Sequence, residues 1–293
     1  MIIQPTAQYT DSNFRQEDID TYRLSIQLRL DGFSFAVINP ETKLLLQVIE
    51  HKLFESVDKS LDKRWLYILE QFKMLMLDTN IKPHLFKKTI ISIDHKEYTL
   101  LPQALFSEGR EEEILTFNQD IPYPYIGFNN LIPGTDHYLI ASFHKFLFKG
   151  LEDIIPQFTP HHHLSILQNQ INKLHRNKNL TKRCYVSITN RDMHIIVMDK
   201  EDLLLCNSYV YTSKEDFVYF ILLAYNQQKM NTEEDPLYFL GDISQSSALY
   251  NISWQYIRNI HFINKTDELF LGPAFDTMAL HQYYSLIHST LCE

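Results

Sequence analysis

Glycine and positive charge are both scarce in this sequence. Only seven of the 293 residues are glycine, whereas about 7% is usual. Loops that cradle phosphates need glycine because the backbone must approach the ligand closely, so most nucleotide-binding fingerprints are excluded. The 36 acidic residues outnumber the 27 basic ones, which gives a net charge of −9 spread along the chain. This balance disfavours a broad nucleic-acid-binding surface.

Cysteines and long apolar runs are also few. Cys184, Cys206 and Cys292 match no metal or redox spacing and suit a reducing compartment. The longest apolar runs, such as 217–225, are far shorter than the roughly 20 residues that span a bilayer. The first residues lack the basic and apolar parts of a secretory signal. We therefore expect a cytoplasmic protein without a membrane span.

An apolar content of 45% is ample for a folded core, and the chain length suggests one large or two medium domains. Residues 22–49 predict a meander of three strands. Its first strand alternates, so that four apolar side chains share one face: Leu24, Ile26, Leu28 and Leu30. Asp31-Gly32 is typical of a tight hairpin turn, and strands follow over 33–39 and 44–49.

The remainder of the first half predicts a helix and a fourth strand, and the second half repeats this order. The helix begins at Leu61 and ends near Asp78, and the strand covers 89–93. The repeat begins at Arg183, which follows Arg23 by 160 residues. Its expected elements are strands at 183–189, 193–199, 203–206 and 236–241, with a helix between the last two that is N-capped by Ser213. Each half therefore predicts the order β-β-β-α-β.

The two halves differ in what is added to them. Residues 94–181 hold six of the eleven prolines and four of the seven glycines, which indicates an inserted subdomain at about 98–140. We expect a first half at 20–182 and a second half at 183–293. Additional helices are expected at 102–106, 143–150, 163–174 and 246–256, with a strand at 259–264 and a final amphipathic segment at 277–290.

The duplicated pattern resembles the ribonuclease-H-like unit of the actin, sugar kinase and chaperone ATPase superfamily. More closely, the chain is similar to an uncharacterised bacterial domain-of-unknown-function family with an actin-like ATPase fold. The segments that carry this resemblance are 98–106, 206–222 and 240–241, and it covers about residues 22–263. It implies an α/β fold with mixed sheets, built from two ribonuclease-H-like halves, and no assigned activity.

The same resemblance suggests where a nucleotide would bind. Asp31 and Gly32 form the first hairpin but are followed by the bulky Phe33, and the matching hairpin at 189–192 has no glycine. Gly241 and Ser244 resemble the purine-side motif, although Asp242 replaces its second glycine. The favoured interpretation is structural: Asp31 and Gly32 form a tight hairpin, and Gly241 forms a strand-to-helix turn. We expect no cofactor, with ATP and Mg as the alternative.

Catalytic and metal-binding patterns are missing from the sequence. Neither first strand, 23–30 or 184–189, contains the carboxylates that ribonuclease-H chemistry needs. The run His161-His162-His163 with His175 lacks the i, i+4 spacing of a helical metal pair, so a structural or exposed turn is favoured over a zinc site. We expect no catalytic residue and no metal ligand.

Aromatic residues are the one excess, at 13% of the chain. Tyr123, Tyr125 and Phe128 lie among prolines and glycines, where exposed rings would suit a protein-binding surface. A loop packed around its own small core is the open alternative. The leading hypothesis is a non-catalytic or degenerate actin-like scaffold that binds another protein. The alternatives are a nucleotide-binding ATPase or kinase-like protein with an altered cleft, and a small-molecule sensor.

Overall fold

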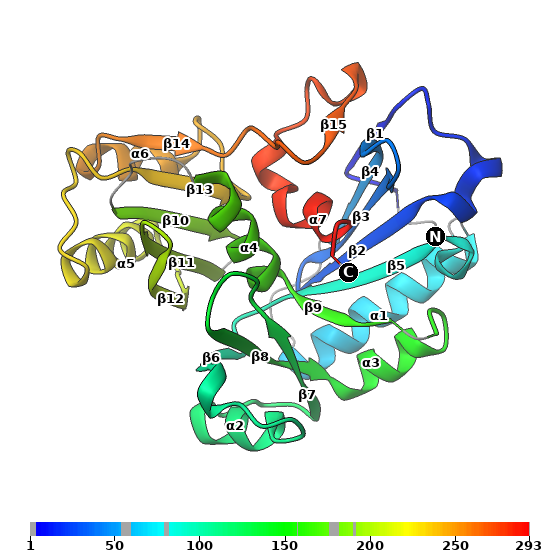
Figure 1. Cartoon of the computed structure of the whole chain (residues 1–293), viewed down its shortest axis with the longest axis horizontal. Helices are drawn as coiled ribbons and strands as arrows, with labels where there is room; N and C mark the ends of the chain where they lie inside the picture. Colours follow the sequence, from blue (N-terminus) through cyan, green and yellow to red (C-terminus); the bar gives the residue numbers. More distant parts are fainter. Residues whose placement is uncertain are drawn as a thin grey trace. The chain divides into compact units, whose positions relative to one another are not determined.

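The computed structural model describes residues 4–53, 60–78, 82–156, 158–175, 182–189 and 192–292, which fold as two compact units (Figure 1). Unit 1 contains Met1–Asn169, Asp267–Met278 and Ser285–Glu293. Unit 2 contains Gln170–Thr266 and Ala279–Tyr284. The boundaries expected from the sequence differ from these units mainly at the C-terminal end, where two segments belong to unit 1.

Unit 1 is built on a mixed sheet with the strand order β1-β4-β3-β2-β5-β9, in which β15 also pairs with β4. The strands are β1 Ala7–Thr10, β2 Arg23–Arg29, β3 Gly32–Asn39, β4 Leu44–Lys52, β5 Lys88–Asp94, β9 Pro160–His162 and β15 Phe270–Leu271. Strands β2, β3 and β4 form the predicted antiparallel meander, and β5 returns parallel to β2.

One face of this sheet forms the apolar core of unit 1. Leu24, Ile26 and Leu28 are at most 1% exposed, as their alternation predicts. Helix α1, Leu61–Asp78, packs Phe72 against Phe33 of β3 with ring centroids 5.5 Å apart.

The predicted turn was one residue too late, because Arg29 pairs with Gly32 across the hairpin and Leu30 therefore lies in the turn with Asp31.

The opposite face of the sheet is polar and buried. The hydroxyl of Ser25 in β2 is hydrogen-bonded to that of Ser289, and Gln27 Nε2 donates to Ser285 Oγ at 3.2 Å. Both serines belong to α7, Tyr284–Ser289. The amphipathic segment expected at 277–290 contains the 3₁₀ turn η5, Leu280–Gln282, and the short α7. These hydrogen bonds explain why the C-terminal segment belongs to unit 1.

The predicted insertion in unit 1 has a small sheet of its own, with the strand order β6-β8-β7. Its strands are β6 Tyr98–Pro102, β7 Tyr125–Leu131 and β8 His137–His144, with α2 Glu111–Asn118 packed on them. The helix expected at 102–106 is only the 3₁₀ turn η3, Gln103–Leu105. The helices expected at 143–150 and 163–174 are present as α3 Lys145–Glu152 and α4 His163–His175.

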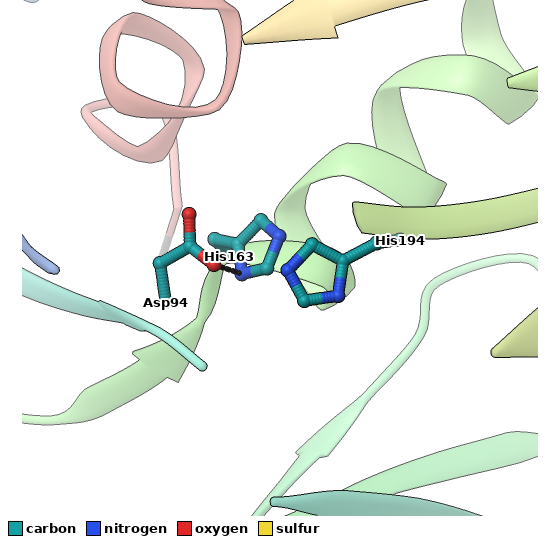
Figure 2. A group of neighbouring side chains, drawn as sticks. All are labelled: Asp94, His163 and His194. Carbon is teal, nitrogen blue, oxygen red and sulfur yellow. Dashed lines mark ion pairs between the residues drawn. The ribbon is translucent and has the colours of Figure 1, made fainter. Parts of the chain in front are cut away.

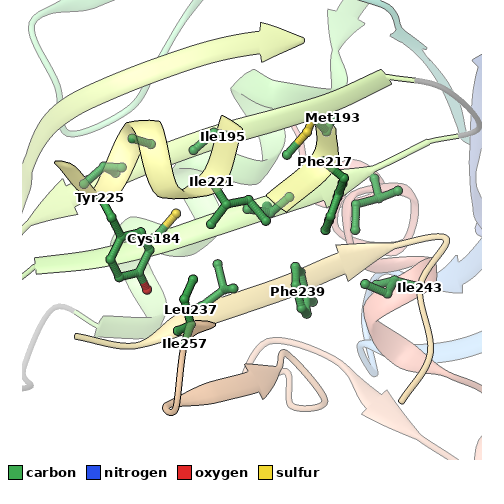
Figure 3. Packing of buried hydrophobic residues seen from close by; sticks show 14 residues of the cluster. Cys184, Met193, Ile195, Phe217, Ile221, Tyr225, Leu237, Phe239, Ile243 and Ile257 are labelled. Carbon is green, nitrogen blue, oxygen red and sulfur yellow. The ribbon is translucent and has the colours of Figure 1, made fainter. Parts of the chain in front are cut away.

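Unit 2 repeats the same design with a sheet in the order β12-β11-β10-β13-β14. Its elements are β10 Lys182–Ile188, β11 Asp192–Asp199, β12 Asp202–Val210, α5 Lys214–Gln227, β13 Leu237–Gly241, α6 Ala248–Tyr256 and β14 Ile260–Phe262. Figure 3 shows Phe217 and Ile221 of α5 on the sheet residues Ile195 and Phe239. Ser213 caps α5 as predicted, since its Oγ accepts from the Asp216 N–H at 3.0 Å.

The two units confirm the predicted duplication. In both, the fourth strand runs parallel to the first, as β5 does to β2 and β13 to β10. Both meanders also have an irregular register between their second and third strands, after Val37 in unit 1 and after Val197 in unit 2. The chain therefore consists of two β-β-β-α-β halves with additions.

Gly32 lies where the first hairpin packs closely against β4. It has a φ of +148°, and a side chain there would collide with the carbonyl oxygen of His51 on β4. Gly134 also has a positive φ, +78°, but has no atom within 4 Å of an added Cβ. We expect Gly134→Ala to cost about 1 kcal/mol of unfolding free energy and Gly32→Ala at least about 2 kcal/mol more. Urea unfolding followed by the fluorescence of the buried Trp65 would measure both; equal costs would contradict the close packing.

Candidate functional site

The carboxyl ends of the parallel strands of unit 1 form the candidate site. Strands β2, β5 and β9 run in the same direction, and Arg29 at the end of β2 lies beside Asp94 at the end of β5. Strand β9 ends at His162 and leads directly into α4. Ligands of open α/β sheets bind beyond such carboxyl ends, so the charged residues there are the first candidates for a site.

Arg29 lies between two carboxylates at this edge. Its Nε is 3.2 Å from Asp31 Oδ1, and its Nη2 donates to Glu50 Oε1 at 2.8 Å. The three side chains are only 6%, 13% and 9% exposed. Arg29 therefore compensates two buried negative charges. The Asp31 carboxylate, which was a candidate nucleotide contact only in the alternative hypothesis, is in an ion pair within the protein.

A second buried ion pair joins β5 to α4. His163 Nδ1 is 3.0 Å from Asp94 Oδ1, and the side chains are 1% and 2% exposed (Figure 2). A carboxylate in this position fixes the orientation of the imidazole ring. Chemically, such a pair can act as an oriented base, or it can give one oxygen and one nitrogen ligand to a metal ion. His194, also drawn in Figure 2, belongs to unit 2, where its Nδ1 is 2.5 Å from Ser208 Oγ.

The histidine run at 161–163 is divided among different environments. His162 is fully buried, and its Nε2 is 3.1 Å from the carbonyl oxygen of His95. His163 forms the ion pair with Asp94. Burial, helped by repulsion from Lys88, lowers the pKa of His161 to about 4. His162 and His163 are buried and His161 is partly buried, so none of the three lies on an exposed turn; the side chain of His175 lies outside the described part of the chain.

The expected aromatic surface is largely absent from the residues proposed for it. Tyr123 and Phe128 are only 6% and 8% exposed, and Tyr125 is half-buried. The Tyr123 hydroxyl is 3.1 Å from Ser142 Oγ, and burial raises the pKa of Tyr123. The open alternative, a loop packed around its own core, therefore describes Tyr123 and Phe128. The exposed apolar residues of the insertion include Leu105 and Phe117, at 68% and 90%.

The four residues named as candidate nucleotide contacts in the alternative hypothesis lie in two units. Asp31 and Gly32 are in unit 1, whereas Gly241, the last residue of β13, and Ser244, three residues later, are in unit 2. Gly241 has a φ of +78°, and a side chain there would collide with the carbonyl oxygen of Ile188. Ser244 is exposed, and residues 190 and 191 of the second hairpin lie outside the described residues. Gly241 thus has a structural role in the turn that ends β13.

Sequence reasoning missed Arg29 and Asp94, and it did not connect His163 with Asp94. Two signals could have identified them. Arg29 stands in an alternating strand at a position that shares a face with Ser25 and Gln27, and that face is buried. Asp94 directly follows the apolar run of β5, and a charge at the end of a buried strand requires a partner. The partner, His163, is distant in sequence and could not be chosen among three adjacent histidines.

The ion pair of Asp94 and His163 should contribute to stability in proportion to its burial. Asp94→Asn keeps the side-chain shape but removes the charge, and we expect it to lower the unfolding free energy by about 3 kcal/mol. The control is Asp153→Asn, which removes the partner of Lys73 in an exposed pair and should cost less than about 1 kcal/mol. Urea unfolding would compare them, and similar values for the two variants would contradict a structural role for the buried pair.

The lowered pKa of His161 predicts a pH dependence. The unfolded chain takes up this proton near pH 6.5, whereas the folded protein resists it until about pH 4. Acidification from pH 7 to 5 should therefore cost the wild type up to about 2 kcal/mol that His161→Gln does not lose. Unfolding free energies at both pH values would measure this difference. Parallel losses in the two proteins would show that His161 titrates normally.

Comparison with known proteins agrees with this architecture. Residues 11–260 match the model of the family described as "Protein of unknown function (DUF3822)". A solved protein from Bacteroides thetaiotaomicron VPI-5482, described as having an actin-like ATPase fold and unknown function, is similar with a TM-score of 0.78 and 22% identity. The match covers 96% of this chain and 99% of that one.

Two further solved structures are more distant. The PilM–PilN type IV pilus biogenesis complex has a TM-score of 0.49 and 11% identity, over 92% of this chain and 96% of the other. The ethanolamine utilization protein EutJ from Carboxydothermus hydrogenoformans has a TM-score of 0.47 and 8% identity, over 92% and 89%. None of the curated proteins matches the sequence. The chain has the actin-like ATPase fold and belongs to the DUF3822 family.

Proposed function

We propose that this chain is a non-catalytic interaction protein of actin-like fold, and that it binds a polypeptide strand at the outer edge of β12. The observation that carries the proposal is a difference between the two halves. In unit 1, the outer edge of β4 is paired with β1 and with β15. In unit 2, the equivalent strand β12 pairs with β11, and no other strand of the described chain adjoins it.

The composition and exposure of β12 support this role. Leu45 and Leu46 in the covered β4 are at most 1% exposed, whereas Leu204 and Val210 in β12 are 37% and 43% exposed. Soluble proteins usually protect edge strands with lysine, proline or a very short strand. Strand β12 is nine residues long and has neither residue type. An exposed apolar edge of this kind can template an additional strand.

The first half indicates what kind of occupant suits this edge. Strand β1 pairs with β4 in antiparallel register, from Ala7 opposite Glu50 to Thr10 opposite Gln47. We infer that β12 takes an antiparallel strand in the same way, and that β12 of a second copy is the occupant. Residues 203–210 are uncharged, so two copies of this edge would bring no like charges together.

The carboxyl edge of unit 1 supports a role without catalysis. The Asp31 carboxylate, which a nucleotide site would need for its metal, is in an ion pair with Arg29.

Within the described residues, no helix is long and apolar enough to span a bilayer. A location in the cytoplasm is part of the proposal and rests on the sequence.

A substitution at the edge tests the proposed dimer. Leu204→Lys adds a positive charge to an exposed position of β12, and in a symmetric pair two such charges would face the same interface. We expect it to weaken dimerisation by about tenfold or more. Sedimentation equilibrium over a concentration series would measure the effect. The control Phe117→Lys removes an even more exposed apolar side chain from the insertion and should leave the dimer intact.

Two results would contradict the proposal. One is a wild-type protein that remains monomeric at the highest concentration at which it stays in solution. In that case the pairing partner of β12 would be a strand from another protein. The other is a rise in the unfolding temperature with Mg-ATP. Ligand at about 1,000 times Kd adds roughly 4 kcal/mol of stability, so a nucleotide-binding protein should be clearly distinguishable.

A further inference from the structure

Unit 1 contains a cavity of about 420 Å³ at the amino ends of β5 and β9, at the opposite end of these strands from the buried ion pairs. It is lined by η2, Pro83–Leu85, by the first residues of β5, by the segment after α3 and by the start of β9. A volume of this size falls within the range of small-molecule sites and far exceeds the space taken by a few water molecules.

The cavity is basic in an acidic protein. Its lining includes two lysines and two histidines, and none of its described lining residues is acidic: His84, Lys87, Lys88 and His161 carry the polar chemistry. His161 pairs with Ser92 across the parallel strands, and Lys88 lies on the same face of β5 as Ser92. The ammonium of Lys88 and the imidazole of His161 therefore point to the same side of the sheet.

Each of these two groups is available for a ligand. The Lys88 ammonium has three donors, and one of them is directed at the Cys292 carbonyl oxygen at 3.3 Å. His161 is mainly neutral at pH 7 because burial lowers its pKa to about 4. A neutral imidazole can donate an N–H to an anion without adding a second buried charge.

The rest of the lining is apolar. Phe86, Ile90 and Ile155 are buried, at 8%, 2% and 3% exposure, and they border the cavity together with two prolines. The positive charge of the described lining comes from lysine, which binds phosphate as a compact point charge. An anionic ligand with a carbon body would fit both the basic part and the apolar part of the lining.

We propose that this cavity binds a phosphorylated small organic molecule, with the phosphate at Lys88 and His161 and the carbon body against Phe86, Ile90 and Ile155. The site lies wholly within unit 1 and does not depend on the edge of β12. A binding site here would make the protein responsive to a metabolite of this chemical class.

Isothermal titration of the full chain with phenyl phosphate tests the proposal, with inorganic phosphate and phenol as partial probes. Phenyl phosphate should bind about tenfold more tightly than either probe, because it alone satisfies both the charge and the apolar surface. Lys88→Met should weaken its binding by about tenfold or more. Lys73→Met, which removes an exposed lysine of α1, should leave binding unchanged.

Lys88 also contacts the C-terminal segment, so Lys88→Met could lose binding through a folding defect. A second variant therefore tests the cavity without changing Lys88. Thr159→Trp places a large ring in the cavity from an exposed position and keeps all four basic residues. It should abolish phenyl phosphate binding while the circular dichroism spectrum stays unchanged. The proposal is overturned if the wild type binds no phenyl phosphate, if phenol binds equally well, or if Thr159→Trp binds normally.

Discussion

Burial of charge at the carboxyl ends of parallel strands constrains unit 1 more than any other feature. The return of β5 alongside β2 places Arg29 beside Asp94, in a sheet whose two faces are both covered. A buried charge without a partner would cost several kcal/mol, so each residue at this edge must be compensated. Arg29 forms ion pairs with Asp31 and Glu50, and Asp94 forms one with His163. These pairs connect the first hairpin, β4 and α4 to one edge and thereby fix the geometry of the half.

Local patterns were sufficient to predict most of the fold. The alternation in β2, the periodicity of α1 and the N-cap Ser213 each depend on neighbours in sequence, and each was confirmed. The duplication was predictable because it repeats these local patterns at a fixed spacing. The first turn was displaced by one residue because cross-strand pairing of Arg29 with Gly32, and not the Asp-Gly dipeptide itself, determines where the hairpin reverses.

The candidate site was much less predictable, because its contacts join distant parts of the chain. Nothing near Asp94 in sequence indicates His163, and nothing near Ser25 indicates Ser289. The C-terminal segment was expected to be amphipathic from its apolar spacing alone. Its serines pair with the polar face of β2, a tertiary contact that this spacing does not indicate. Tyr123 and Phe128 were misplaced for a similar reason: the small sheet of the insertion supplies the core that buries them.

The two ends of the parallel strands in unit 1 differ in how their charges are compensated, and this difference bears on function. At the carboxyl end, acidic and basic side chains neutralise one another within the protein. At the amino end, Lys87 and Lys88 face a cavity whose described lining contains no carboxylate. Since the chain has a net charge of −9, the positive charge at this end is not an average property of its surface. An anion entering unit 1 would therefore gain more at the amino end than at the edge where related folds are expected to bind phosphate.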